Sequence, residues 1–400
     1  MQTRAHVEAS GHAPVPVRVV VLDHTAALGG AELSLLRLLD VAPPDIVAHV
    51  LLFASGRLSD ALSERHVTTT VLPLTRRINE TDRHSAGASH LQMVTQAVAV
   101  LPHVLRVART LRRLNPDIVY TTSLKADLIG GLAAVLAGKP LVWHIHDRIS
   151  TDYLPGPLVA LLRSLASHLP RRVIVNSQAT ADTLPGVAAV IAYPGFSRDQ
   201  VGPRPGERTP PNPPAVGLIG RISPTKGQRE FVRAAAIVHD TIPEARFRII
   251  GSAMFDQAPY EREVRDECAR LGMEEFIEFT GFVDDPAAQL DALTVCVHAS
   301  PTPEPFGQVI VEAMIRGVPV VATSGGGVDE IVAPDDDLLG WLARPSDPDS
   351  LASAIIEALT QPEEARRRAE LAWEAAIRRF PVEETARVVS EVWRSVARGR

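Results

Sequence analysis

Short runs of apolar, β-branched residues alternate with longer segments of helical periodicity along most of this 400-residue chain. This alternation is typical of α/β domains built on parallel sheets, whose strands are buried on both faces and therefore lack a polar side. In the first half we expect strands at residues 17–22, 47–53, 118–121, 141–145 and 173–176, and helices at residues 32–39, 98–114 and 127–136.

A proline-rich break divides the chain into two halves of similar design. Residues 202–214 (GPRPGERTPPNPP) contain six prolines and no periodic apolar pattern, as expected for a linker. The alternation then restarts, and 400 residues exceed what one ordinary core holds. Further strands are expected at residues 215–219, 247–250, 277–280, 295–298 and 318–322.

We therefore predict two Rossmann-like, doubly wound domains, at residues 17–201 and 215–378, facing a central cleft. Residues 1–16 are expected to be flexible, and residues 76–92, which are polar and aperiodic, are expected to form a mobile loop. The last segment, 379–400, contains a helix at residues 382–398. This helix either ends the second domain or crosses back to the first.

The composition excludes several classes of protein and partner. Binding of nucleic acid requires basic patches and aromatic rings for stacking, and a net charge of −6 with 4% aromatic residues gives no sign of either. Cys268 and Cys296 lie far from any metal-ligand or disulfide spacing, which suits a reducing cytoplasm. No signal peptide and no apolar run of membrane-spanning length are visible, so we expect a cytoplasmic protein.

One basic stretch is compatible with a peripheral contact between the protein and the inner face of the membrane. The stretch fits a solvated helix face or a contact with anionic headgroups. Its residues are Arg106, Arg109, Arg112 and Arg113.

The segment HASPTPEPFGQVIVE, which starts at residue 298, carries the clearest chemical signal. Gly307 precedes an expected helix, and the unpaired N–H groups of a helix start favour a phosphate. A sugar is then expected near Glu304 and a ribose at Glu312, whose carboxylate can accept two hydrogen bonds from paired hydroxyls. A capped surface helix with two solvated glutamates is the alternative. The phosphates are expected at Phe306, Gly307 and Gln308.

This segment resembles the E-x7-E motif of the family-4 retaining glycosyltransferases, which have the GT-B fold. Other motifs that resemble the family follow in order along nearly the whole chain, and the ordered series is far more specific than any single motif. They are LGGAE at 28–32, WHIHD at 143–147, VNS at 175–177, GR at 220–221 with KG at 226–227, GFV at 281–283, and GG at 326–327 with Glu330.

The resemblance implies a role for each motif. Arg221 and Lys226 would stabilise the charge that develops on the departing nucleoside diphosphate, although a solvated pair is the usual fate of such residues. Gly29 and Gly30, which lack a Cβ, would let the backbone approach the phosphates.

His146 would contact the donor sugar, and Glu32 is expected to cap its helix. The nucleotide base of the donor would lie at Phe282 and Val283. The reserve candidates for the sugar contact, besides His146, are His144 and Asp147.

The family resemblance implies retention by front-face attack, in which Glu304 binds sugar hydroxyls. A carboxylate beside the anomeric carbon can also form a covalent intermediate, so this alternative stays open. We expect no metal and no cofactor, because Arg221 and Lys226 replace a divalent cation. The carboxylates at Asp347 and Asp349 and at residues 335–337 fit turns and a helix start instead.

The expected activity is the transfer of a sugar from a nucleotide-diphosphate sugar to an acceptor hydroxyl. A UDP-sugar is the first choice of donor and a GDP-sugar the second, and the acceptor is a glycan, a glycolipid or a small molecule. The alternatives are a nucleotide-sugar 2-epimerase-like enzyme and a protein that binds nucleotide sugars without transferring them.

Overall fold

The computed structural model describes residues 16–74, 90–254, 257–334 and 338–399. The expected flexible segment 1–16, apart from its last residue, most of the expected loop 76–92 and the carboxylates at 335–337 lie outside the described residues. Residues 90–92 are described and begin helix α4 (His90–Leu114), so the loop prediction is wrong there. These three residues include no glycine or proline, and polar side chains alone do not prevent helix formation.

Seven parallel strands form the first sheet, in the order β3-β2-β1-β4-β5-β6-β7. All five expected strands are present, with ends within one residue of the prediction. The edge strands β3 and β7 were not expected, because one contains three threonines and the other has three residues. The strands are β1 (Val17–Asp23), β2 (Ile46–Leu52), β3 (Thr68–Val71), β4 (Ile118–Thr121), β5 (Leu141–Ile145), β6 (Arg172–Val175) and β7 (Ala189–Ile191).

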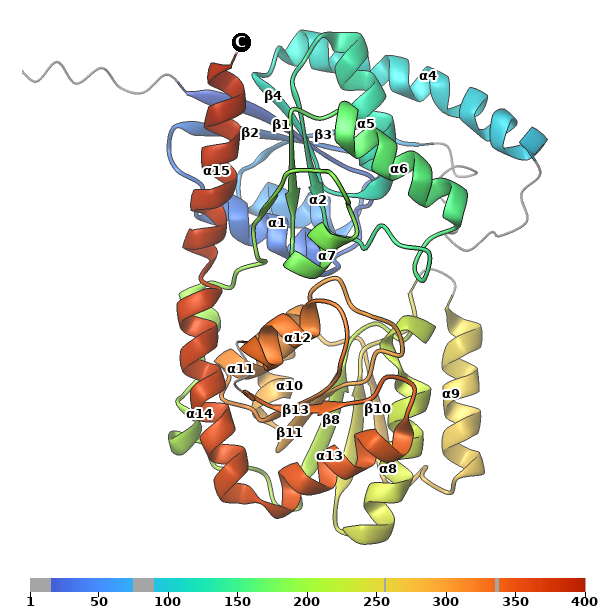
Figure 1. Ribbon diagram of the computed structural model, residues 1–400, viewed down its shortest axis with the longest axis vertical. Coiled ribbons are helices and arrows are strands. Elements are labelled where there is room, and N and C mark those ends of the chain that lie inside the picture. Colours follow the sequence, from blue (N-terminus) through green and yellow to red (C-terminus); the bar gives the residue numbers. More distant parts are fainter. Residues whose placement is uncertain (1–15, 75–89, 255–256, 335–337, 400) are drawn as a thin grey trace, which may run out of the picture.

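Helices cover both faces of this sheet, which explains why its strands read as continuous apolar runs (Figure 1). One face packs against α4, α5 (Leu124–Ala137) and α6 (Gly156–His168). The other face packs against α1 (Gly30–Asp40), α2 (Arg57–Glu64) and α15 (Val382–Arg398). The short helix α7 (Gln178–Asp182) follows β6.

Six parallel strands form the second sheet, in the order β10-β9-β8-β11-β12-β13, so the two-domain fold expected from the alternation is confirmed. Its strands are β8 (Ala215–Ile219), β9 (Arg246–Ile250), β10 (Ile277–Gly281), β11 (Val295–His298), β12 (Val320–Thr323) and β13 (Trp341–Ala343). Its helices are α8 (Gln228–Thr241), α9 (Ala258–Arg270), α10 (Pro286–Asp291), α11 (Gln308–Ile315), α12 (Gly327–Val332), α13 (Pro348–Thr360) and α14 (Pro362–Arg379).

The last two helices run along both domains. In Figure 1, α14 lies beside the lower domain and α15 beside the upper one. Trp393 of α15 is fully buried and packs edge-on against Tyr120 of β4, with ring centroids 5.1 Å apart. Arg394 donates two hydrogen bonds of 2.8 Å to Asp45, which fixes the end of α15 on the first domain.

The proline-rich segment 202–214 lies against the second domain. A 3-10 turn, Pro205–Glu207, interrupts it, and helix α14 packs against this turn. The guanidinium of Arg208 donates to the carbonyl oxygens of Gly317 and Leu293, at 3.0 and 2.9 Å. Side-chain bonds to backbone carbonyls therefore hold the segment in place, although it contains little regular structure.

Candidate active site

The predicted site residues follow the carboxyl ends of the strands, where ligands bind in open α/β sheets. Hydrogen bonds between the two domains show that these ends face each other: the side chain of Gln308 donates to the carbonyl of Gly30 at 2.9 Å. Gly29 and Gly30 follow β1; His146 and Asp147 follow β5; Arg221 and Lys226 follow β8; Phe282 and Val283 follow β10; Glu304, Phe306, Gly307, Gln308 and Glu312 follow β11.

Glu304 is held between two basic side chains. Lys226 donates a short hydrogen bond to Oε1, and Nε2 of His298 lies 3.2 Å from Oε2. Burial favours the neutral carboxyl, but the charge of Lys226 and the contact with His298 outweigh it and hold the pKa of Glu304 well below its usual range. Glu304 is thus an ionised carboxylate. His298, which was expected only to end a strand, is part of this cluster.

Two glycines bring Lys226 and Glu304 together. Gly227, at φ +71°, lies so close to the next loop that a Cβ would stand 1.8 Å from the carbonyl oxygen of Ala299. Gly326, at φ +70°, lies against Glu304 itself, where a Cβ would stand 2.1 Å from its carbonyl oxygen. A larger residue fits neither position, so these glycines are required for the close approach of the loops.

Helix α11 begins at Gln308, directly after its N-cap Gly307, and the bond from the Gln308 side chain to Gly30 places this helix start at the domain boundary. A helix start there offers unpaired N–H groups of the kind that bind a phosphate. The Phe306 side chain is not available there, because it is buried against Tyr193 and Phe380. Only the backbone of Phe306 can serve a phosphate. The Gln308 side chain instead bridges the domains, since its Oε1 accepts a 2.6 Å hydrogen bond from Arg37 of α1.

Arg37 also reaches Glu312, the expected ribose anchor. Its Nη1 lies 3.6 Å from Oε1 of Glu312, one turn after Gln308 on the same side of α11. Arg37 therefore provides a positive charge that faces this carboxylate. Arg37 was not predicted from the sequence, because Gln308 and Glu312 lie about 270 residues further along the chain.

The charge of Arg221, in the second domain, acts on Glu32 of the first domain. Glu32 Oε2 accepts a 2.9 Å hydrogen bond from the amide of Gly29, as expected for a capping residue. Burial, and then repulsion from Asp23, raise the pKa of Glu32 to about 7, while the positive charge of Arg221 acts in the opposite direction. The exposed Arg221 is thus close enough to the glycine loop to influence a buried acid there.

His144 of β5 and His146, the first residue after the strand, lie side by side with ring centroids 4.0 Å apart. His144 is buried, and its Nδ1 forms a short hydrogen bond with the hydroxyl of Tyr120. Burial lowers the pKa of His146 to about 4, so its ring is neutral at physiological pH. Asp147 accepts a 2.8 Å hydrogen bond from Tyr153.

Phe282 borders a cavity of about 450 Å³ between the domains. Its ring is half exposed, and the guanidinium of Arg57 lies 4.3 Å above it while also donating to Asp284 at 2.8 Å. The cavity is lined by residues 25–28 and 54–57 of the first domain and by Ser252, Met254 and Phe282 of the second.

Glu330 joins the domains from helix α12. Its two carboxylate oxygens accept hydrogen bonds from the backbone amides of Gln178 and Ala179, at 3.0 and 2.6 Å, and so cap helix α7 of the other domain. The hydroxyl of Tyr193 donates to it as well, at 3.0 Å. Glu330 therefore has a structural role in this cleft.

Replacing Glu330 with alanine is expected to lower the free energy of unfolding by about 2–3 kcal/mol, because it removes charge-assisted hydrogen bonds and uncaps α7. Differential scanning calorimetry should show the lower transition temperature. Glu357→Ala, at an exposed position of α13, is the matched control and should stay near wild type. Equal transition temperatures for the two variants would contradict the capping role.

A helix start explains Asp347, one of the carboxylates considered for a metal. Asp347 is the N-cap of α13 and accepts a 2.9 Å hydrogen bond from the amide of Ser350. Within the described ranges, no cluster of three His, Cys, Asp or Glu side chains is arranged to bind a metal ion. In the same ranges no helix is both long enough and apolar enough to cross a bilayer.

Comparisons with known proteins extend over both domains. The family model described as Glycosyltransferase Family 4 matches residues 28–192, and the one described as Glycosyl transferases group 1 matches residues 204–374. A 2-deoxystreptamine N-acetyl-D-glucosaminyltransferase of Streptomyces fradiae is 30% identical over 298 residues, which are 67% of this chain and 69% of that protein.

Two further similar proteins are described together with a nucleotide or a nucleotide sugar. A GDP-mannose-dependent phosphatidylinositol monomannoside mannosyltransferase of Mycolicibacterium smegmatis is 24% identical over 331 residues, 76% of this chain and 84% of that protein. The crystal structure of Anabaena HepE with UDP and glucose superposes with a TM-score of 0.80 and 28% identity, over 95% of this chain and 100% of that one.

Proposed function

The chain belongs to the family 4, group 1 glycosyltransferases, and from this membership we propose that its donor is a UDP-sugar, with a GDP-sugar as the second choice. It is a retaining glycosyltransferase that takes its sugar from a nucleotide-sugar donor. The assignment of UDP is supported by HepE, which was crystallised with UDP and glucose and also with UDP-glucose. The mannosyltransferase that uses GDP-mannose is more distant in sequence.

In our proposal the second domain, 215–378, holds the donor and the first, 17–201, holds the acceptor. Lys226, Arg221 and the amide groups at the start of α11 neutralise the diphosphate, and they do so most strongly when it leaves. The position of Lys226 supports this role. It lies beside Glu304 at the carboxyl edge of the sheet, in the loop next to the one that leads into α11.

The remaining contacts divide the donor into its parts. Glu312 accepts hydrogen bonds from the ribose hydroxyls, which displace Arg37 or share the carboxylate with it. Phe282 and Val283 meet the base beside the interdomain cavity, and the neutral ring of His146 contacts the transferred sugar. Gly29 and Gly30 approach the phosphates from the first domain.

The reaction proceeds by front-face attack. The acceptor oxygen forms its bond to the anomeric carbon on the side from which the diphosphate leaves, and its proton passes to a phosphate oxygen of the leaving group. Glu304 binds sugar hydroxyls and balances the charge of Lys226. A carboxylate already paired with a lysine and a histidine is a weak nucleophile, which favours this role over a covalent intermediate.

The acceptor class is a glycan, a glycolipid or a small molecule, bound by the loops of the first domain. We propose a cytoplasmic enzyme that makes a peripheral contact with the inner face of the membrane, and we propose that it works without a metal ion. The two cations at the diphosphate supply the charge that a divalent ion would otherwise contribute.

A thermal-shift series in the presence of EDTA tests the donor assignment. We expect UDP-glucose to raise the transition temperature by several degrees and GDP-mannose to raise it less, since ligand at 100 times its Kd adds about 2.7 kcal/mol to stability. A larger shift with GDP-mannose would reverse the order of donors. A shift that appears only after magnesium is added would overturn metal independence.

A further inference from the structure

The charge of the chain is unevenly distributed. Residues 90–172 carry ten lysines and arginines against four aspartates, a net charge of +6, whereas the whole chain carries −6. Helix α4 contains no acidic residue at all along its sequence. The segment that supplies α4, α5 and α6 is therefore basic in a chain whose remaining residues are acidic.

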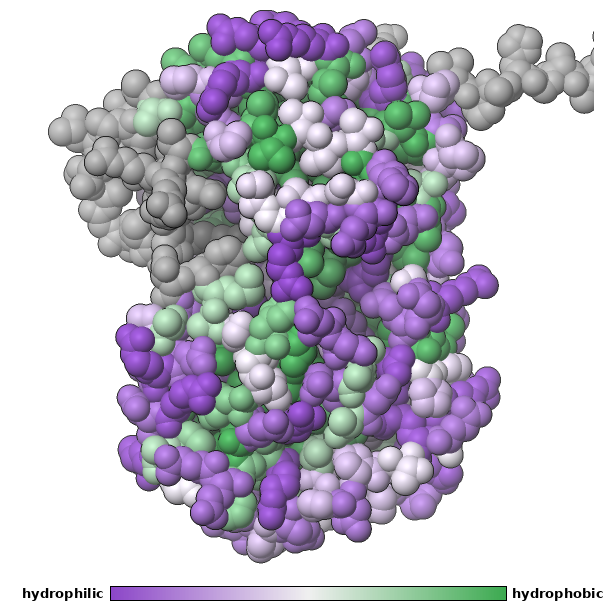
Figure 2. All heavy atoms as spheres, turned by 180° about the vertical axis from the view of Figure 1, so that it is seen from behind, coloured by the Kyte–Doolittle hydropathy of each residue, from purple (hydrophilic) through white to green (hydrophobic). Residues whose placement is uncertain are grey.

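Apolar side chains are exposed on the same three helices. Leu132, Val135 and Leu136 occupy successive turns of α5 and form a stripe, called here the α5 stripe, whose members are 44–58% exposed. Leu101 and Leu105 of α4 and Leu161 of α6 are exposed as well. By contrast, hydrophilic residues cover most of the second domain in the rear view of Figure 2, with apolar residues in scattered patches.

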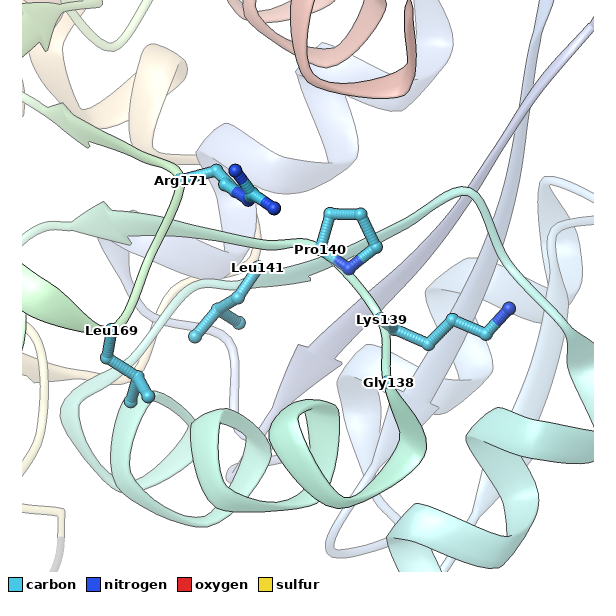
Figure 3. Close-up of a pocket in the computed structure, with 6 residues that line it drawn as sticks. All are labelled: Gly138, Lys139, Pro140, Leu141, Leu169 and Arg171. Atoms are coloured by element: carbon cyan, nitrogen blue, oxygen red, sulfur yellow. The ribbon is translucent and has the colours of Figure 1, made fainter. Parts of the chain in front are cut away.

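A cavity of about 410 Å³ lies at the end of α5 and is lined by residues 138–141, Leu169 and Arg171. Lys139 and Arg171 lie on either side of Pro140 (Figure 3). The ammonium of Lys139 donates to Asn115, and Arg171 has no ion pair with any described residue. This cavity is at the amino-terminal ends of β5 and β6, the edge of the sheet opposite the active site.

Side-chain contacts join these features into one surface. Arg112 of α4 donates to the carbonyl of Leu136 in the α5 stripe, and Lys139 binds Asn115 just after α4. The basic ends of α4 and α5 are therefore adjacent. Arg109 and Arg113 are exposed on α4 and form no ion pair within the described part of the chain. We call the α5 stripe, Arg109, Arg113, Lys139 and Arg171 together the docking surface.

Cations near helix ends also interact favourably with the helix dipole, and this accounts for Arg112. The dipole does not explain an apolar stripe on the outward side of α5, nor an arginine at a cavity between two strands. Exposed apolar residues flanked by basic ones match the chemistry of an anionic bilayer, which offers acyl chains beneath negative headgroups.

We propose that the docking surface binds the surface of an anionic lipid bilayer, with the α5 stripe at the acyl boundary and the cavity around Lys139 and Arg171 accepting a lipid phosphate. The site lies at the opposite edge of the first sheet from the cleft, so bilayer and nucleotide sugar bind at the same time. This inference does not rest on the identity of the donor.

Co-sedimentation with vesicles tests it, using phosphatidylcholine alone or phosphatidylcholine with phosphatidylglycerol. The charge variant is Arg109→Gln with Arg113→Gln and Arg171→Gln, and the apolar variant is Leu132→Gln with Val135→Gln. The matched control replaces three exposed arginines of the second domain: Arg229→Gln, Arg262→Gln and Arg378→Gln.

We expect wild type and control to sediment with phosphatidylglycerol vesicles, and salt to release them. Each lost charge should weaken binding about fivefold, which corresponds to about 1 kcal/mol for one basic side chain near an anionic surface, so the charge variant should bind about a hundredfold more weakly. The apolar variant should bind more weakly while keeping its salt dependence. Donor-induced thermal shifts should be unchanged in both.

Absence of wild-type binding to phosphatidylglycerol vesicles would overturn the proposal, and would leave an acidic protein as the partner to examine. Equal losses in the charge variant and the matched control would also overturn it, because overall charge and not this surface would then be responsible.

Discussion

Replacing Lys226 with methionine is expected to lower kcat about 100- to 1000-fold while changing KM much less. The ammonium acts mainly on the charge that the diphosphate gains as the glycosidic bond breaks, and losing one such donor typically costs about 2.7–4 kcal/mol of transition-state stabilisation. Lys226 is held by Glu304 and by the turn at Gly227, so it needs little rearrangement before reaction. Initial rates of UDP release with saturating donor measure the effect.

Two companion variants separate charge from packing. Lys226→Arg keeps the charge and should recover part of the rate. Arg229→Met changes an exposed residue in the first turn of α8, three positions further along, and should stay near wild type. A fall in kcat of less than tenfold for Lys226→Met, with its transition temperature unchanged, would remove Lys226 from the leaving-group site.

The central strands could be predicted because burial on both faces produces a continuous run of apolar residues in the sequence. The sequences IVYT of β4 and LVWHI of β5 are fully buried, and their limits were predicted without error. The edge strands gave no such signal. Strand β3 reads TTTV, and β13 has three residues, so pairing with a neighbour defines them more than their own composition does.

The candidate site was predictable where its residues follow a strand or start a helix. Glu304, Lys226 and Gly307 are close in space because strand ends in parallel sheets share one edge, which the sequence pattern implies. The roles of Arg37 and Glu330 could not be predicted in this way. Their partners belong to the opposite domain, so their roles depend on how two separately folded units are oriented, and local sequence does not encode that orientation.

Replacing Glu304 with glutamine is expected to lower kcat about tenfold, and replacing it with alanine about 100-fold or more. The amide has the shape of the carboxylate and keeps hydrogen bonds to sugar hydroxyls, but it cannot balance Lys226, and a charge-assisted hydrogen bond contributes about 1.5–3 kcal/mol. Alanine removes both functions. Near-full activity of the glutamine variant would exclude a nucleophilic role, and a tenfold loss is still far too small for a missing nucleophile.

Intact-mass measurement of the wild type after rapid mixing with donor gives the independent evidence. We expect no glycosylated enzyme, because the Glu304 oxygens are engaged by Lys226 and His298. A covalent adduct on Glu304, with activity abolished in the glutamine variant, would instead establish a two-step mechanism.

The pH dependence of Glu304→Gln provides a further check. Burial acts to raise the pKa of Glu304, but Lys226 and His298 hold it below the ordinary value of 4.5, so the carboxylate stays ionised at pH 5 and loses its charge only at more acidic pH. An acid limb of kcat/KM near pH 5 to 6 must then come from another group. We therefore expect the wild type and Glu304→Gln to share the same acid limb, and a limb that disappears in the variant would show that Glu304 itself titrates during catalysis.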